Sequence, residues 1–195
     1  MTSRVHSGRI RRELRFSREI VASNLKNSGL DVDQVKPLLE AIMESDGLLG
    51  LQGRELLLLE KALGIRDGSP AVRLVGELVL VKTVPAETGI SYGYLSRTEK
   101  PTRLGLVALG FSDGLPRNLS NQIEVEVTGK FYPSRGRIAM DQCVIELGTD
   151  NPTIGSEVHF INEANNLKKL AEISGFSELE ILGRITSRVT RTWQS

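Results

Sequence analysis

Three polar segments between Val84 and Leu147 carry the residues that could do chemistry. They are VPAETGISYG (84–93), LGFSDGLPRNLSN (109–121) and GRIAMDQC (136–143). Each combines glycine and a turn-forming residue with a charged or aromatic group, next to an aliphatic run that favours a strand. Functional side chains are often carried on loops that a rigid sheet supports. The three segments therefore predict a working surface at the ends of strands.

Tyr92 and a set of arginines are the candidate reactive groups. Tyr92 stands between Ser91 and Gly93 in an expected turn, where its phenol can act as a general acid or base or simply pack as a ring. A guanidinium matches a carboxylate or a phosphate, so the arginines near these loops could converge on an anion or be ordinary surface charges. These arginines are Arg97, Arg103, Arg117, Arg135 and Arg137. The residues alone leave both interpretations open.

Composition argues against several other classes of function. The net charge of +1 creates no field that would attract nucleic acid or a membrane surface. No apolar run approaches about 20 residues, so we expect no membrane span. The single cysteine, Cys143, cannot form an internal disulfide and favours a reducing cytoplasm. Because Cys143 and the two histidines lie far apart in sequence, without metal-ligand spacing, we expect no metal site.

Residues 69–195 are predicted to form a mainly antiparallel β-barrel or sandwich, because short strand-like runs alternate with Gly/Pro turns. The expected strands are 72–82, 103–109, 123–127, 131–133, 138–147, 157–161, 180–185 and 188–193. Thr128-Gly129-Lys130 is expected to be a hairpin turn, and residues 165–174 one helix. With a helical region before it, the chain is predicted to be of the α+β class.

Residues 1–68 are predicted to be that short helical region. Ile10, Leu14, Val21 and Leu25 could form one apolar stripe, a second helix is expected to start at Asp31 or Asp33, and a third to span 52–63. Arginines crowd the first helix, and a solvated helix face is favoured over a contact for an acidic partner or nucleic acid. They are Arg4, Arg9, Arg11, Arg12, Arg15 and Arg18.

The three loop segments, in this order, resemble the C-terminal β-domain of alanine racemase. The family's VPAG-x-x-x-x-YG is matched by Val84-Pro85-Ala86 and Tyr92-Gly93, and its IGYADG-x-x-R by 110–114 with Arg117. Its GR-x-x-MDQ is matched by Gly136-Arg137 and Met140-Asp141-Gln142. Weaker matches at 154–158, 180–182 and 188–191 extend the resemblance over about residues 71–193. Several ordered motifs are a stronger signal than any one of them alone.

The resemblance implies a role for each matched residue. The tyrosine matching Tyr92 is the base that takes the α-proton from L-alanine. The residue matching Met140 contacts the substrate carboxylate through its backbone N–H. Residues matching Phe111, Arg117, Arg137 and Asp141 lie along the substrate entry corridor. In the family a separate eight-stranded barrel holds pyridoxal phosphate on a lysine, and the site is shared across a dimer.

This sequence also departs from the family. A (β/α)₈ barrel needs about 200 residues, whereas residues 1–70 read as a few helices, so no cofactor is expected to bind to this chain alone. Phe111 stands where the family usually has tyrosine, and Thr190 where its closing motif has proline. We therefore expect a β-domain that completes an alanine-racemising site only with a separate pyridoxal-phosphate barrel protein or in an oligomer. The alternatives are a non-catalytic binding or regulatory module, and a truncated product with no current task.

Overall fold

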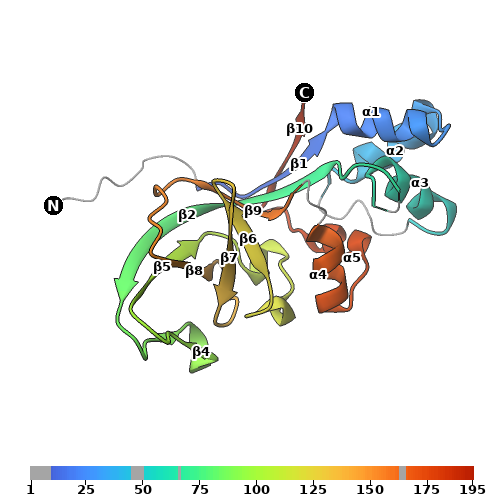
Figure 1. Cartoon of the computed structure of the whole chain (residues 1–195). Coiled ribbons are helices and arrows are strands. Elements are labelled where there is room, and N and C mark those ends of the chain that lie inside the picture. The colour runs from blue at the N-terminus through green and yellow to red at the C-terminus, as the bar shows by residue number, and fades with distance from the viewer. Residues whose placement is uncertain (1–9, 45–50, 66, 163–165) are drawn as a thin grey trace.

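The long strand β2 (Val72–Val84) organises the fold, shown in Figure 1. The structure is a computed structural model, and it describes residues 10–44, 51–65, 67–162 and 166–195. Arg4 and Arg9, which belong to the predicted arginine-rich helix, and Asn165, the predicted start of the later helix, lie outside these residues. Val72, Leu74 and Leu78 of β2 are buried, so this strand crosses the core of the molecule.

Strands of residues 72–161 close into an antiparallel barrel. The order β2–β5–β8–β7–β6–β9 returns to β2, because β9 pairs with the first half of β2 and β5 with its second half. The bounds are β5 Thr102–Val107, β6 Glu124–Val127, β7 Lys130–Arg135, β8 Cys143–Gly148 and β9 Glu157–Ile161. The predicted α+β class with a mainly antiparallel barrel is confirmed.

The hairpin between β6 and β7 turns at the residues that the sequence indicates. Thr128 and Gly129 have φ values of 49° and 80°. A tight hairpin of type I′ needs positive φ at both central positions, which glycine adopts without steric cost. The predicted turn at 128–130 is therefore confirmed, and its backbone twist matches that of the flanking strands.

Two elements were predicted with the wrong secondary structure. Glu13–Ser17 forms strand β1 and not the start of a helix, and β1 pairs antiparallel with β2 and parallel with β10 (Thr190–Gln194). Leu14 and Phe16 are fully buried while their neighbours are not, which is the period-two pattern of a strand. Glu178–Arg184 forms helix α5 and not a strand, because Ser177 and Glu180 build a capping box at its start.

Three short helices follow β1. Figure 1 shows that they lie near the N-terminal end of β2, where β1 pairs with it, and away from β4. They are α1 (Arg18–Asn27), α2 (Val32–Ala41) and α3 (Arg54–Ala62). Asp31 caps α2 by accepting a hydrogen bond from the N–H of Asp33. Of the two predicted starting residues, Asp31 and Asp33, the helix therefore uses Asp31. The solvated helix face predicted for the arginines is wrong for Arg11, Arg12 and Arg15, which lie in or just before β1 and make ion pairs there.

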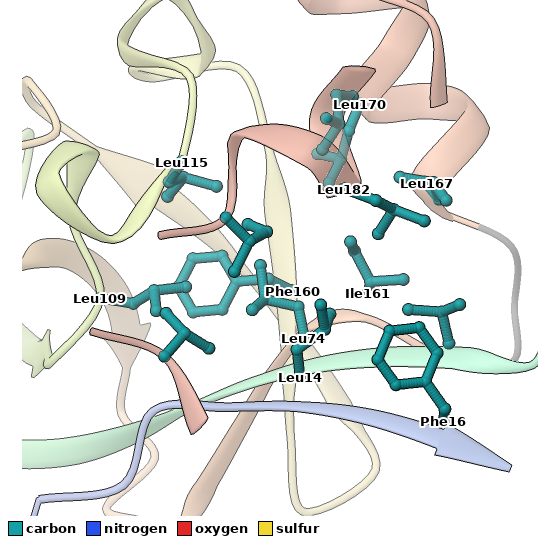
Figure 2. Close-up of a cluster of buried hydrophobic side chains, with 14 of the residues drawn as sticks. Leu14, Phe16, Leu74, Leu109, Leu115, Phe160, Ile161, Leu167, Leu170 and Leu182 are labelled. Carbon is teal, nitrogen blue, oxygen red and sulfur yellow. The ribbon is translucent and has the colours of Figure 1, made fainter. Parts of the chain in front are cut away.

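One continuous hydrophobic core joins the barrel, β1 and the C-terminal helices. Figure 2 shows Leu14 and Phe16 of β1 beside Leu74 of β2 and Phe160 of β9. Helix α4 (Asn166–Ser174) and α5 cover this cluster through Leu170 and other buried side chains. Burying this apolar surface is the dominant favourable term in folding.

The predicted boundary between residues 68 and 69 remains a prediction, but β1, from the first region, belongs to the same sheet as β2. Among the described residues, no helix combines the length and the apolar composition that crossing a membrane requires. The three candidate loops follow strands β2, β5 and β7 of the barrel.

Candidate functional site

In the loop after β2, the residue just before Tyr92 has an unusual backbone conformation. A small hairpin, β3 (Gly89–Ile90) and β4 (Ser96–Arg97), encloses the 3₁₀ turn η1 (Tyr92–Tyr94). Ser91 has φ 57° and ψ −171°, a region that only glycine adopts readily. Strain of this kind costs free energy and persists where the surrounding structure enforces it, often at functional sites. Tyr92 itself is 72% exposed, so its ring is not part of the core.

The segment after β7 enforces this conformation. The Ser91 hydroxyl donates a hydrogen bond of 2.7 Å to the carbonyl oxygen of Arg137. Gly136 packs so closely that a Cβ there would lie 2.7 Å from the Ile90 oxygen. The Arg137 guanidinium passes near Gly93, since a Cβ on that glycine would lie 3.8 Å from Cζ of Arg137. The structure thus brings the predicted site residues Tyr92 and Arg137 to adjacent loops.

The loop after β5 is bonded to the other end of the same segment. The N–H of Phe111 donates to the Ala139 oxygen at 3.0 Å, and the N–H of Ser112 to the Met140 oxygen at 2.9 Å. Gly110 allows this approach, because a Cβ there would lie 2.3 Å from the Met140 oxygen. The 3₁₀ turn η2 (Phe111–Asp113) is therefore fixed against the Met140-Asp141 segment.

A charged cluster lies beneath this junction. Asp113 has no exposed side-chain surface, and its Oδ2 accepts a 2.8 Å hydrogen bond from the Gly110 N–H. Arg188 Nε lies 3.1 Å from Asp113 Oδ1, and Arg12 Nε lies 3.4 Å from Oδ2. A buried carboxylate is tolerated when it is paired and hydrogen-bonded in this way. Asp113 therefore joins the Gly110 turn to both ends of the described chain.

Asp141 completes the cluster at the surface. Its carboxylate pairs with Arg188, and its carbonyl oxygen accepts from Arg12 Nη2 at 3.4 Å. The hydrogen bond to Asp141, together with the charge of Asp113, raises the pKa of Arg188 above its ordinary value. Arg188 and Arg12 thereby position the segment that carries Met140.

Met140 has an exposed side chain and a backbone donor without a partner among the described residues. The side chain is 55% exposed, and within the described residues the Met140 N–H donates no hydrogen bond. An unpaired N–H at the surface can bind a carboxylate oxygen. The geometry is compatible with the contact that the family resemblance implies.

Phe111 and Arg117, on the loop after β5, lie against each other. The Arg117 Cζ lies 5.4 Å from the centre of the Phe111 ring, a cation–π geometry. Arg117 begins the 3₁₀ turn η3 (Arg117–Leu119). In the part of the chain that the structure describes, neither Arg117 nor Arg137 forms an ion pair with a carboxylate. Two exposed guanidinium groups without a carboxylate partner therefore lie on these loops, Arg137 beside Gly93 and Arg117 beside Phe111.

The six predicted residues thus occupy three interlocked loops, but they do not all touch. Phe111 and Arg117 are in contact, and Arg137 lies against the Tyr92 loop. Across the described residues, no hydrogen bond, ion pair or ring contact links Tyr92 to the other five. Such a separated set can line a cavity only when another surface faces it.

Sequence reasoning missed Arg12 and assigned no site role to Arg188. Arg188 belongs to a matched closing motif, but nothing in that motif says which carboxylate it pairs with. Arg12 stood in a run of arginines, and its strand neighbours Leu14 and Phe16 alternate with charged residues. That alternation was the available signal, because it places Arg12 beside a sheet and not on a solvated helix.

The loops do not fit the direct holding of pyridoxal phosphate. An aldehyde cofactor held as a Schiff base needs a lysine amine. The segments 84–97, 109–121 and 136–143 contain no lysine. In the described part of the chain, no three His, Cys, Asp or Glu side chains come together as a metal site would require. The surface offers a phenol, backbone N–H groups and guanidinium groups.

The closed antiparallel barrel, with three interlocked loops at its strand ends, defines the class of protein: a β-domain whose candidate site lies on loops. The family model "Alanine racemase, C-terminal domain" matches residues 71–193, so the chain belongs to that family.

Relatives of known sequence and structure support the same family assignment. The alanine racemase of Streptomyces coelicolor is 42% identical over 128 residues, which cover 64% of this chain and 33% of that protein. Its structure matches with a TM-score of 0.63 and 38% identity over 70% of this chain and 35% of that chain. An alanine racemase structure from Bartonella henselae with covalently bound pyridoxal phosphate matches with a TM-score of 0.61 and 25% identity, covering 64% of this chain and 35% of that chain. The chain spans about a third of the length of these relatives.

Proposed function

We propose that this chain supplies the β-domain half of an alanine-racemising active site, in trans with a separate chain that carries the pyridoxal-phosphate barrel. The exposure of Tyr92 and Met140 on loops that hydrogen bonds fix to one another is the observation that carries this proposal. Neither side chain contributes to the hydrophobic core, because both are exposed. Their exposure is explained if a second surface covers them.

Each residue then has a task. The Oη of Tyr92 takes the α-proton from L-alanine and, in the reverse direction, returns it. The Met140 N–H donates to the substrate carboxylate. Arg117, Arg137 and Asp141 line the entrance with Phe111, and the unpaired guanidinium groups attract the carboxylate to it. Pyridoxal phosphate, held by the barrel chain, supplies the electron sink that makes the α-proton acidic. The lone, buried Cys143 supports a reducing compartment, and we place the protein in the cytoplasm.

The test is complementation of a barrel protein by this chain. The candidate barrel protein is recovered by co-purification from the native cell and recognised by its cofactor absorbance. Conversion of L- to D-alanine is then measured for each protein alone and for the mixture, and light scattering distinguishes a mixed complex from a homo-oligomer. We expect activity only in the mixture. Activity of the isolated chain, or a mixture that forms a complex but stays inactive, would contradict the proposal.

A matched pair of tyrosines tests the catalytic assignment. Tyr92→Phe should lower kcat of the mixture at least about a hundredfold, the scale of general acid–base catalysis. Tyr94→Phe, in the same turn and 63% exposed, should stay within about twofold of wild type. Equal kcat values for Tyr92→Phe and wild type would sink the assignment of Tyr92 as the base.

The alternative is a non-catalytic binding or regulatory module. The region of α1–α3, which lies before the family match at residue 71, favours it, as does the missing hydroxyl at Phe111. Under this alternative, a pull-down with the chain captures a partner protein that lacks pyridoxal phosphate. Substituting surface residues of α1–α3 then abolishes the capture.

A further inference from the structure

A cavity of about 370 Å³ lies between α1 and α2, outside the loops of the proposed racemase site. Helices α1 and α2 each pack against α3 and so leave a groove between themselves. Val21, Leu25 and Leu39, which are buried, form its floor, and Trp193 of β10 forms a wall. This volume is at the lower end of the range for small-molecule sites.

Trp193 is held in place at this wall by two neighbours. Its ring lies 5.5 Å from the Phe16 ring, and Arg18 Cζ lies 5.5 Å from the centre of the Trp193 ring. An indole with a ring on one side and a guanidinium nearby is a pre-positioned apolar surface. The cavity wall is therefore formed before any ligand arrives.

The cavity mouth carries more positive than negative charge. Arg18 and Lys36 line it with a single carboxylate, Glu40, so the lining carries a formal charge of +1. Within the described residues, neither Arg18 nor Lys36 forms an ion pair with a carboxylate. Long cationic side chains rest their stems on apolar surface while their charged heads stay available. An apolar floor beneath unpaired cations matches a molecule with an apolar body and an anionic head.

We propose that this cavity binds a small amphiphilic monocarboxylate. The carboxylate lies between Arg18 and Lys36, and the hydrocarbon body rests on Leu25, Leu39 and the Trp193 indole. Glu40 selects against a second negative charge, so a monoanion is preferred over a dianion. The cavity lies outside the three loops of the racemase half-site, and its residues on α1 and α2 precede the family match, whereas Trp193 falls within it.

Intrinsic fluorescence gives a direct test, because Trp193 is the only tryptophan in the chain. The full chain is titrated with octanoate, and with 1-octanol and octylammonium as neutral and cationic probes of the same chain length. We expect a saturable change in Trp193 emission with octanoate alone, matched by calorimetry. Equal responses to all three probes, or no saturable binding of octanoate, would overturn the proposal.

Two matched sets of variants locate the site. Arg18→Gln with Lys36→Gln should weaken octanoate binding about tenfold or more, whereas Lys26→Gln on the same helix should leave it unchanged. Ala22→Phe fills the groove and should abolish binding, whereas Ser23→Phe, the next residue along α1, should not. Circular dichroism and Tm verify that each variant is folded. Binding that survives in folded Ala22→Phe would place the ligand elsewhere and overturn the assignment.

Discussion

Arg188 Nε lies 3.1 Å from Oδ1 of Asp113, a carboxylate that has no exposed surface. Arg12 Nε approaches the other oxygen of the same carboxylate at 3.4 Å. One buried negative charge thus joins a residue before β1 to a residue before β10, beneath the loop that carries Met140. These ion pairs hold the loops of the proposed site together, although the side chains that make them are not among those proposed to touch a substrate.

Removing this buried charge should destabilise the fold. Asp113→Asn leaves two guanidinium groups without their shared carboxylate. We expect a loss of about 3 kcal/mol in the free energy of unfolding, at the low end for breaking a buried pair because both arginines keep some solvent contact. Urea denaturation followed by circular dichroism measures it. Asp141→Asn is the control, and should cost less than about 1 kcal/mol because that side chain is half exposed. Similar losses in both variants would show that burial of Asp113 is not what matters.

Gly110→Ala should separate the two loops at the proposed site. The new Cβ would meet the Met140 and Ala139 carbonyl oxygens at 2.3 and 2.5 Å, and backbone cannot yield as a side chain can. A cost of about 1–3 kcal/mol is expected from such overpacking, with faster amide exchange at Phe111 and Ser112, whose N–H groups bond this segment. In Gly76→Ala the nearest atoms are side-chain atoms at 3.1–3.4 Å, so the cost should be smaller. The idea fails if Gly110→Ala is the milder variant.

Loss of the hydroxyl group should destabilise the fold at Tyr132 but not at Tyr92. The Tyr132 hydroxyl donates a 2.9 Å hydrogen bond to Asp150 from a ring that is only 6% exposed. Tyr132→Phe should therefore lower the free energy of unfolding by about 1 kcal/mol, whereas Tyr92→Phe should change it by less than about 0.5. Thermal unfolding of both variants checks this. A marked loss of stability in Tyr92→Phe would mean that Tyr92 is structural.

Stability should fall in two stages as pH decreases. Burial holds the pKa of His159 below its ordinary 6.5, so near and below that pH the unfolded chain takes up a proton that the folded chain does not. The hydrogen bond from Arg15 holds the pKa of Glu157 below its ordinary 4.5, which adds a second loss as pH falls below that value.

Matched variants separate the two stages. His159→Gln should flatten the decline in the free energy of unfolding near pH 6, and Glu157→Gln the decline below about pH 4.5. Urea titrations from pH 8 to 3 provide the measurement. Stability that rises on acidification through pH 6 would contradict the assigned state of His159.

Cys143 should be inert in the folded protein. It is buried, and burial raises the pKa of its thiol to about 12, so almost no thiolate is present at neutral pH. A thiol reagent such as iodoacetamide should label it only after denaturant is added, as mass spectrometry would show. Rapid labelling under native conditions would mean that β8 opens readily.

The barrel could be predicted from sequence because its strands depend on local pattern. Val72–Lys82 and Glu157–Ile161 are β-branched runs between turn residues, and both form strands close to the expected bounds. The turn at Thr128-Gly129 depends on the local backbone preference of these two residues. In these places the local preference and the tertiary structure agree.

One error, helix α5, had a local signal, because its capping box of Ser177 and Glu180 can be read in the sequence. The error at β1 arose where distant residues decide the structure. Leu14 and Phe16 form a strand because residues 72–75 and 190–194 provide hydrogen-bonding edges on both sides. The sequence prediction favours a helix because Leu14, Val21 and Leu25 recur at helical spacing. For the site, motif matching named the exposed residues, but the pairing of Arg12 and Arg188 with Asp113 joins positions about 75 to 100 residues apart, which no local pattern encodes.

The parallel pairing of β1 with β10 also has a mechanical consequence. Glu13 faces Thr190 and Ser17 faces Gln194, so the first and last strands of the described fold run side by side in the same direction. A pulling force between the two termini would load all hydrogen bonds of this ladder together, in shear, instead of opening them one after another. The terminal strands should act as a clamp that resists extension until the ladder breaks in a single event.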